Sequence, residues 1–236
     1  MTRIVLVAPR INALLLDFGH TLFDTASSPA FIVSWAAAHG STIALDDATR
    51  LWDEARVASR TPEEFGKGRD RTPELHRACW TDLWSALDER APGLADALYQ
   101  HETGPEGWVP YADTCAFLVG AKERGLKIAI ISDVAFALEP LLEHHGLDSL
   151  IDVFVLSYRH GALKADGPLL FDVALQALGA AASGALMVGD NHVNDGLGIT
   201  AGVRTFLLPP APTGSSRGLA SVLALVDGLG AFETAQ

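Results

Sequence analysis

The chain of 236 residues has little of several things, and each shortage excludes a class of protein. Its 2 cysteines, Cys79 and Cys115, are too few for a disulfide framework and are not spaced as a metal knuckle. Its 17 lysines and arginines form no cluster that would bind a nucleic-acid backbone. No apolar run approaches the roughly 20 residues that cross a bilayer, and residues 1–10 lack the cleavage site of a secretory signal. We therefore expect a cytoplasmic protein with neither a nucleic-acid nor a membrane partner.

The chain is rich in hydrophobic residues. Hydrophobic residues make up 49% of it and charged residues 19%, which is the composition of a compact globular protein. The length allows one large domain, or a core with a smaller inserted domain. Because the formal net charge is −12, an anionic ligand would need local help from a metal ion, a lysine or backbone amides.

From residue 128 onward short apolar runs alternate with helix-patterned stretches, and one more apolar run lies near the N-terminus. The predicted strands are 14–16, 128–131, 153–156, 185–188 and 203–208. The predicted helices between and after them are 136–145, 168–178, 194–201 and 219–229. Repeated strand and helix units of this kind predict an α/β fold with a doubly wound parallel sheet.

The segment 26–107 has a different pattern, with no convincing strand. Its helix-patterned stretches are 31–39, 48–59, 73–88 and 94–102. Breakers at 27–29 and at 103–107 are suitable hinges. We predict an all-helical cap at 26–107, inserted into an α/β core formed by 1–25 and 108–236.

Chemistry-bearing side chains follow the predicted strands. Asp17 ends the run 14–16 before a glycine-containing turn, where it is either a nucleophile or a solvated residue that starts the turn. Ser132 and Asp133 end the next run, where a hydroxyl and the following amides can hold an anion, although both residues also suit a helix N-cap. Lys164 precedes a helix start and is suited to neutralising a bound anion, although an isolated lysine there is more often on the surface.

The run 185–188 ends in a loop that carries two carboxylates, Asp190 and Asp195. Hard cations such as Mg²⁺ take such oxygens, whereas a capped helix with solvated acids is the alternative. Asp17, Ser132, Lys164 and Asp190 each follow a predicted strand, so we expect them on one rim of the sheet.

With these positions the chain resembles the haloacid dehalogenase superfamily. The four motifs of that family are an Asp-x-Asp-Gly-Thr loop, a strand-end Ser or Thr, a Lys, and a Gly-Asp with a further Asp. The resemblance covers nearly the whole chain, and the helical segment between the first two motifs is similar to the type with a cap inserted there. It implies a Rossmann-like core and a hydrolase, most often a phosphatase that forms an aspartyl-phosphate.

The resemblance also implies a role for each matching residue. Asp17 would be the nucleophile, Ser132 with Asp133 would hold the phosphoryl oxygens, and Lys164 would neutralise them. The implied cofactor is Mg²⁺, with Asp17, the carbonyl of Gly19, Asp190 and Asp195 as its ligands or supports. The implied substrate is a small anionic, phosphorylated metabolite.

The first motif departs from the family pattern at Gly19, where phosphatases carry an Asp that serves as general acid and base. The carbonyl is kept but the acid is lost, and general acid–base catalysis contributes roughly 10²- to 10⁴-fold. Hydrolysis of alkyl phosphate esters should then be slow. His20, with an ordinary pKa of about 6.5, is a candidate replacement, although its side chain need not point at the site.

Three functions stay open at this point. The first is a Mg²⁺-dependent phosphatase, favoured for substrates with good leaving groups such as acyl phosphates. The second is a phosphonatase-like or dehalogenase-like hydrolase. A phosphonatase of this family needs a cap lysine, and Lys67 is the only lysine in 26–107. A dehalogenase of this family works without metal. The third is a non-catalytic phosphoryl-binding protein. The cap residues expected to meet an anionic substrate are Arg60, Lys67, Arg69 and Arg71, and the oligomeric state cannot be read from the sequence.

Overall fold

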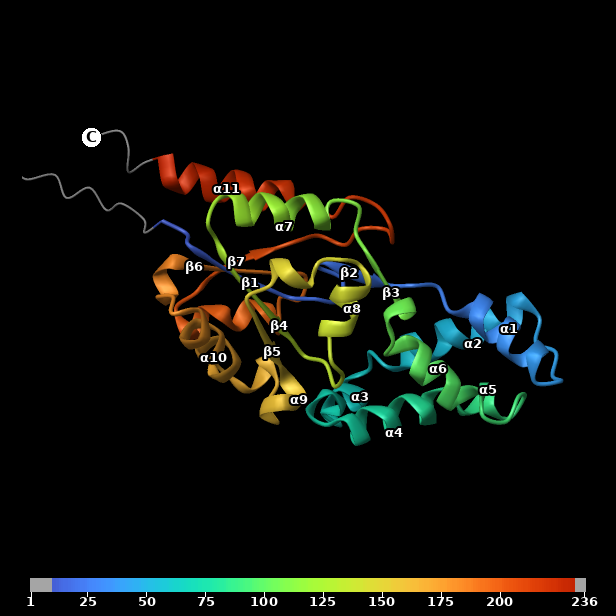
Figure 1. The fold of residues 1–236 in the computed structure, drawn as a ribbon. Coiled ribbons are helices and arrows are strands. Elements are labelled where there is room, and N and C mark those ends of the chain that lie inside the picture. The colour runs from blue at the N-terminus through green and yellow to red at the C-terminus, as the bar shows by residue number, and fades with distance from the viewer. Residues whose placement is uncertain (1–9, 232–236) are drawn as a thin grey trace, which may run out of the picture.

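A five-stranded parallel sheet forms the centre of the larger part of the molecule (Figure 1). The computed structural model describes residues 10–231. Its strand order is β5-β4-β1-β6-β7. The strands are β1 (Ala13–Leu16), β4 (Lys127–Ser132), β5 (Val153–Leu156), β6 (Ala185–Gly189) and β7 (Arg204–Leu207). The predicted parallel α/β sheet is confirmed, and the winding direction reverses beside β1, which is where ligands bind in such sheets.

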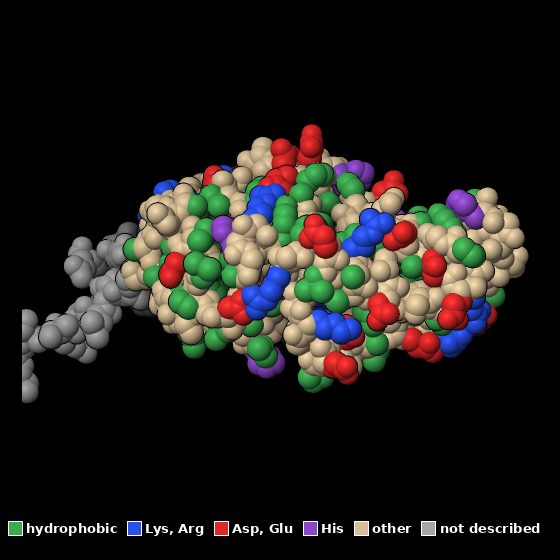
Figure 2. Space-filling view, turned by 90° about the horizontal axis from the view of Figure 1, so that it is seen from below, with side chains coloured by type: hydrophobic (Ala, Val, Ile, Leu, Met, Phe, Trp, Pro, Cys, Tyr) green, Lys and Arg blue, Asp and Glu red, His purple; other side chains and the backbone are tan. Residues whose placement is uncertain are grey.

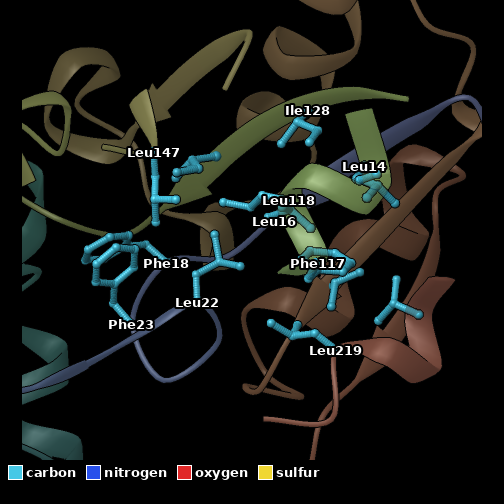
Figure 3. Close-up of a cluster of buried hydrophobic side chains, with 14 of the residues drawn as sticks. Leu14, Leu16, Phe18, Leu22, Phe23, Phe117, Leu118, Ile128, Leu147 and Leu219 are labelled. Atoms are coloured by element: carbon cyan, nitrogen blue, oxygen red, sulfur yellow. The ribbon is translucent and has the colours of Figure 1, made fainter. Parts of the chain in front are cut away.

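The central strand is apolar throughout because both of its faces are covered. Leu14 and Leu16 point to one face, where they pack with Phe117, Leu118 and Leu219 (Figure 3). Ala13 and Leu15 point to the other face. Successive strand residues alternate between faces, so helices on both sides of the sheet turn β1 into a continuous hydrophobic run.

Helices α7 (Thr114–Glu123), α8 (Glu139–His144) and α11 (Ala220–Ala231) contribute to the first of these clusters, and α10 (Leu169–Leu178) contributes to the second. The segment predicted as a helix at 194–201 is the 3₁₀ helix η6 (Asp195–Ala201). It packs closely on the sheet, since a Cβ on Gly198 would lie 3.0 Å from Thr205 Oγ1 and 3.3 Å from Met187 Cβ. Two glycines, Gly196 and Gly198, also weaken its α-helical propensity.

A second group of helices lies beside the sheet (Figure 1). They are α1 (Pro29–Ala38), α2 (Leu45–Ala58), α3 (Pro62–Gly66), α4 (Pro73–Leu83), α5 (Ser85–Asp88) and α6 (Leu94–Glu102). They surround a hydrophobic cluster of their own that includes Ile32, Trp52 and Leu98. The helix expected at 73–88 is interrupted at Trp84, which separates α4 from α5. The cap boundaries at 26 and 107 stay a prediction.

A short antiparallel pair that the sequence did not indicate joins the two parts. β2 (Phe23–Thr25) pairs with β3 (Trp108–Pro110), so Thr25 lies opposite Trp108. Strands of three residues are too short to show an alternating pattern. The remaining elements are α9 (Ser157–His160) and the 3₁₀ turns η1 (Arg69–Arg71), η2 (Pro105–Gly107), η3 (Asp148–Leu150), η4 (Lys164–Asp166) and η5 (Ala182–Gly184).

The helical part also contacts the sheet part through η1. The Arg71 guanidinium donates to both carboxylate oxygens of Asp166 at 2.7 Å, and Ser157 Oγ donates to the carbonyl of Asp70 at 2.6 Å. These contacts hold the helical part against the turn that carries Lys164. The face shown in Figure 2 mixes acidic, basic and apolar side chains. No helix between residues 10 and 231 is long and apolar enough to cross a membrane.

Candidate active site

The strand β1 ends directly before Asp17, whose backbone amide donates to the carbonyl of Val188 at 2.9 Å and so extends the pairing of β1 with β6. The side chain lies at the sheet edge with a relative exposure of 7%. Burial raises the pKa of its carboxyl to about 7; Lys164 opposes the rise, and the carboxylates of Asp195 and Asp190 add to it. Ionisation of Asp17 therefore depends on its positive partner, and the charge of a bound cation would favour it further.

Lys164, in η4, is that partner. Its Nζ donates to Asp17 Oδ1 at 2.7 Å and to Asp195 Oδ1 at 2.5 Å, and the residue is 2% exposed. Burial lowers the pKa of this ammonium, but Asp17 and Asp195 outweigh it and hold the pKa above the ordinary lysine value. The side chain is thus a permanent positive charge next to the candidate nucleophile.

Asp195 is completely buried and has donors on both oxygens. Oδ1 accepts from Lys164, and Oδ2 accepts from the amides of Asp190 at 3.0 Å and Asn191 at 2.9 Å. The close approach of this carboxylate requires glycine at 189, because a Cβ there would fall 2.1 Å from Asp195 Oδ2. Asp195 therefore fixes both the lysine and the loop that carries Asp190.

One carboxylate oxygen from each of Asp17, Asp190 and Asp195 lies within 4.8 Å of the others, a grouping that suits a metal ion, although both oxygens of Asp195 already accept hydrogen bonds. Burial raises the pKa of Asp190, His20 lowers it, and Asp195 raises it further. One lysine faces three acids, so a divalent cation would offset the surplus negative charge. Hard oxygen donors of this kind fit Mg²⁺.

Ser132 and Asp133 lie at the end of β4, as the sequence predicts, and both line the same cavity as Asp17. The Asp133 carboxylate is already engaged: Oδ1 accepts from the Lys164 amide at 2.8 Å and Oδ2 from Asn194 Nδ2 at 3.1 Å. Asp133 thus braces two neighbouring loops, a role for which its position in the sequence carries no signal. A direct contact with substrate stays a prediction for both residues.

The turn after Asp17 has an unusual backbone. His20 has φ +56°, a left-handed conformation that favours glycine. Its Nδ1 lies 2.9 Å from Asp24 Oδ1, and Thr213 Oγ1 donates to the other oxygen of Asp24. Burial opposes ionisation of Asp24, but the hydrogen bonds from His20 and Thr213 outweigh it and lower its pKa to about 2. Sequence patterns did not indicate Asp24 as the partner of His20, although Asp24 lies only four residues further along the chain.

Asp17 opens onto a cavity of about 660 Å³ that is lined by both parts of the molecule. Gly19, His20 and Asp190 line it from the sheet side. From the helical side it is lined by Trp52, Arg56, Arg60, Arg69, Asp70, His76, Trp80, Trp84, Tyr99 and Glu102, among others.

Only two of the four predicted cap cations, Arg60 and Arg69, are among the lining residues. Lys67 instead donates to Glu64 Oε1 at 2.5 Å, and Arg71 is bound to Asp166. Neither of these two side chains lines the cavity in this structure, and a contact with substrate stays a prediction for them.

A sequence model of the haloacid dehalogenase-like hydrolases matches residues 11–202, which is most of the chain. The chain belongs to this family. Among the relatives of this hydrolase is the mouse haloacid dehalogenase-like hydrolase domain-containing protein 3, which is 30% identical over 185 residues, 74% of this chain and 72% of that protein. A phosphoserine phosphatase of Thermus thermophilus is 36% identical over 118 residues, which are 49% of this chain and 46% of the phosphatase.

Solved structures of this superfamily have the same fold. The crystal structure of a phosphatase of this superfamily from Thermococcus onnurineus superposes with a TM-score of 0.62 at 19% identity, covering 92% of this chain and 99% of that one. Structures of dehalogenases are similar to the same degree, so the fold alone does not separate the two activities. The family, the fold class and a hydrolase, all expected from the four motifs, are confirmed.

Proposed function

We propose that this hydrolase is a Mg²⁺-dependent phosphatase that acts on a small phosphorylated metabolite through an aspartyl-phosphate at Asp17. The observation that carries the proposal is the convergence of Asp17, Lys164 and the acidic pair Asp190 and Asp195 at one point of the sheet edge. A relative named as a phosphoserine phosphatase supports the phosphoryl chemistry.

In the first step a carboxylate oxygen of Asp17 attacks the substrate phosphorus, while the bond from phosphorus to the leaving-group oxygen breaks. Lys164 favours the ionised form of Asp17 and faces the incoming negative charge, since its Nζ lies 2.7 Å from the attacking carboxylate. The Ser132 hydroxyl would donate to a phosphoryl oxygen. Bound Mg²⁺ would be held by Asp17, Asp190 and the Gly19 carbonyl, and would neutralise charge on the phosphoryl group.

Asp195 acts indirectly in this scheme. Because both of its oxygens already accept hydrogen bonds, it orients Lys164 and the Asp190 loop rather than offering a free ligand atom. In the second step water attacks the phosphorus of the aspartyl-phosphate, which frees the Asp17 carboxylate and releases inorganic phosphate.

The missing acid at Gly19 selects among substrates. An acyl phosphate releases a carboxylate, which needs no proton, whereas an alkyl ester releases an alkoxide that does. We therefore place acyl phosphates and other esters with good leaving groups first. His20 lines the cavity and is paired with Asp24, and its role as a replacement acid remains part of the proposal.

The alternatives have less support. A phosphonatase needs a cap lysine with a free amine at the substrate, but Lys67 is bound to Glu64, and this hydrogen bond raises its pKa. Dehalogenation without metal would not use the clustered carboxylates of Asp17, Asp190 and Asp195 as cation ligands. A binding protein without turnover has only Gly19 in its favour.

Hydrolysis of acetyl phosphate, measured with Mg²⁺ and with excess EDTA, tests the proposal. We expect turnover that requires both Mg²⁺ and Asp17, so that Asp17→Asn abolishes it. The exposed residue Asp172, on α10, supplies a matched control, and Asp172→Asn should keep full activity. Turnover that survives in EDTA or in Asp17→Asn would overturn the mechanism, and no turnover of any phosphate substrate would leave the binding role.

A further inference from the structure

Three arginines of the helical part, Arg56, Arg60 and Arg69, line the cavity onto which Asp17 opens. In a chain with a formal net charge of −12, such cations would be expected to have acidic partners. The other cap arginines do: Arg50, Arg71, Arg77 and Arg90 each form a salt bridge with an aspartate or glutamate. Among residues 10–231 no salt bridge involves any of the three cavity arginines.

Aromatic rings and a carbonyl hold two of these guanidinium groups in place. Arg56 lies over the Trp52 ring at 4.6 Å, and Arg69 lies over the Trp80 ring at 5.2 Å while donating to the carbonyl of Ser59 at 2.8 Å. An arginine stacked on an aromatic face keeps its N–H edges available for a planar or tetrahedral anion. The cations are therefore positioned before any ligand arrives.

The acids of the same wall do not serve as their ion-pair partners. Glu102 Oε1 accepts from Trp52 Nε1 at 3.0 Å and from Ser28 Oγ, and burial raises the pKa of Glu102 despite the nearby Arg56. Asp70 lies 3.6 Å from His76 Nε2, and burial raises its pKa to about 6 despite Arg69. Neither acid forms a salt bridge that would occupy an arginine.

We propose that Arg56 and Arg60, supported by Arg69, form a subsite for a second anionic group on the substrate, so that the natural substrate is a phosphate compound whose leaving group carries a carboxylate or a second phosphate. This inference rests on the proposed phosphatase function and extends it to the leaving group. The cavity of about 660 Å³ is lined by these three arginines as well as by Asp17 and Lys164, so one ligand can meet both groups.

Two pairs of compounds that differ in one anionic group test the subsite. Glycerol 3-phosphate and 3-phosphoglycerate differ by the carboxylate, and fructose 6-phosphate and fructose 1,6-bisphosphate differ by the second phosphate. Binding is measured by calorimetry with Mg²⁺ in the Asp17→Asn background, which prevents turnover. We expect at least one of the two compounds with the additional anionic group to bind about tenfold more tightly than its partner, and the pair that shows this identifies the group.

The preference should disappear in Arg56→Gln combined with Arg60→Gln and persist in Arg50→Gln, a control on the same helix α2 whose arginine pairs with Glu54. Equal binding within both pairs, or a preference that survives the double variant, overturns the subsite. Acetyl phosphate turnover by the unmodified chain is measured separately. A binding preference without turnover removes the phosphatase proposal and keeps the subsite. Turnover without a binding preference removes the subsite and keeps the phosphatase proposal.

Discussion

The ammonium of Lys164 is shared between two buried carboxylates, 2.7 Å from Asp17 and 2.5 Å from Asp195. Asp195 in turn accepts hydrogen bonds from the backbone amides of Asp190 and Asn191, so a continuous series of contacts joins the ends of β1 and β6 to η4. The candidate nucleophile, the lysine and the acidic loop therefore form one electrostatic unit, in which a loss at any member exposes the charge of another.

Lys164→Met should destabilise the fold strongly at pH 7. Removing one partner of a buried ion pair leaves uncompensated charge, and such changes cost about 3–5 kcal/mol of unfolding free energy. The raised pKa of Asp17 means that this carboxyl takes up a proton as the pH falls, so the loss should be smaller at pH 5 than at pH 8. Urea unfolding at the two pH values measures it. Lys122→Met, which breaks the exposed pair with Asp152, is the control and should cost less than about 1 kcal/mol; equal losses would contradict the buried-charge argument.

Gly19→Asp should fold normally and gain activity on alkyl esters. The Cβ of the new residue would meet only the Trp108 ring, at 3.6 Å, which is an ordinary contact. With the acid restored, kcat/KM for glycerol 3-phosphate should rise by roughly 10²-fold or more. Gly19→Asn fills the same space without an acid and should show no gain. If both variants gain equally, the side chain acts by shape and not by proton transfer.

The left-handed backbone of His20 predicts a difference between two substitutions. Both His20→Gly and His20→Ala lose the pairing with Asp24, but only alanine has to bear the steric cost of φ +56°. His20→Gly should therefore be more stable than His20→Ala by about 1 kcal/mol in denaturant unfolding. Equal stabilities would show that the turn relaxes out of this conformation.

His76 should make the fold sensitive to mild acid. Its Nδ1 lies 2.9 Å from Tyr99 Oη and its Nε2 accepts from Trp80 Nε1 at 3.1 Å, which requires the neutral ring. Burial, with a contribution from Arg69, lowers its pKa to about 3, whereas the unfolded chain takes up the proton near pH 6.5. The stabilising contribution is thus complete above about pH 6.5 and is lost as the pH falls toward 3.

Between pH 6.5 and pH 5 this loss amounts to about 2 kcal/mol. Unfolding free energies of the wild type and of His76→Gln, measured over this range, should differ in slope, with the variant less dependent on pH. Asp70, whose raised pKa acts in the opposite direction, is present in both proteins. Parallel slopes would mean that the pKa of His76 is the same in the folded and the unfolded chain.

Much of the sheet and of its catalytic edge could be predicted from local patterns. A strand buried on both faces must be apolar at every position, so β1 and β6 stand out as uninterrupted runs, and the first polar residue after each run lies at the carboxyl edge of the sheet. Asp17 and Asp190 were found for this reason. The short pair β2 and β3 was not, because three-residue strands have no period to detect.

Only the tertiary structure decided which charged side chains face the cavity. Sequence patterns do not distinguish among the cap cations Arg60, Lys67, Arg69 and Arg71. In the structure Arg60 and Arg69 line the cavity, whereas Lys67 and Arg71 form ion pairs elsewhere. Arg56 also lines the cavity, which the sequence did not indicate. The sequence by itself determined the strands and the order of the polar residues at their ends, because a strand buried on both faces needs consecutive apolar residues. The partner of a long, flexible side chain depends on what the rest of the fold brings within a few ångströms, which no local pattern records.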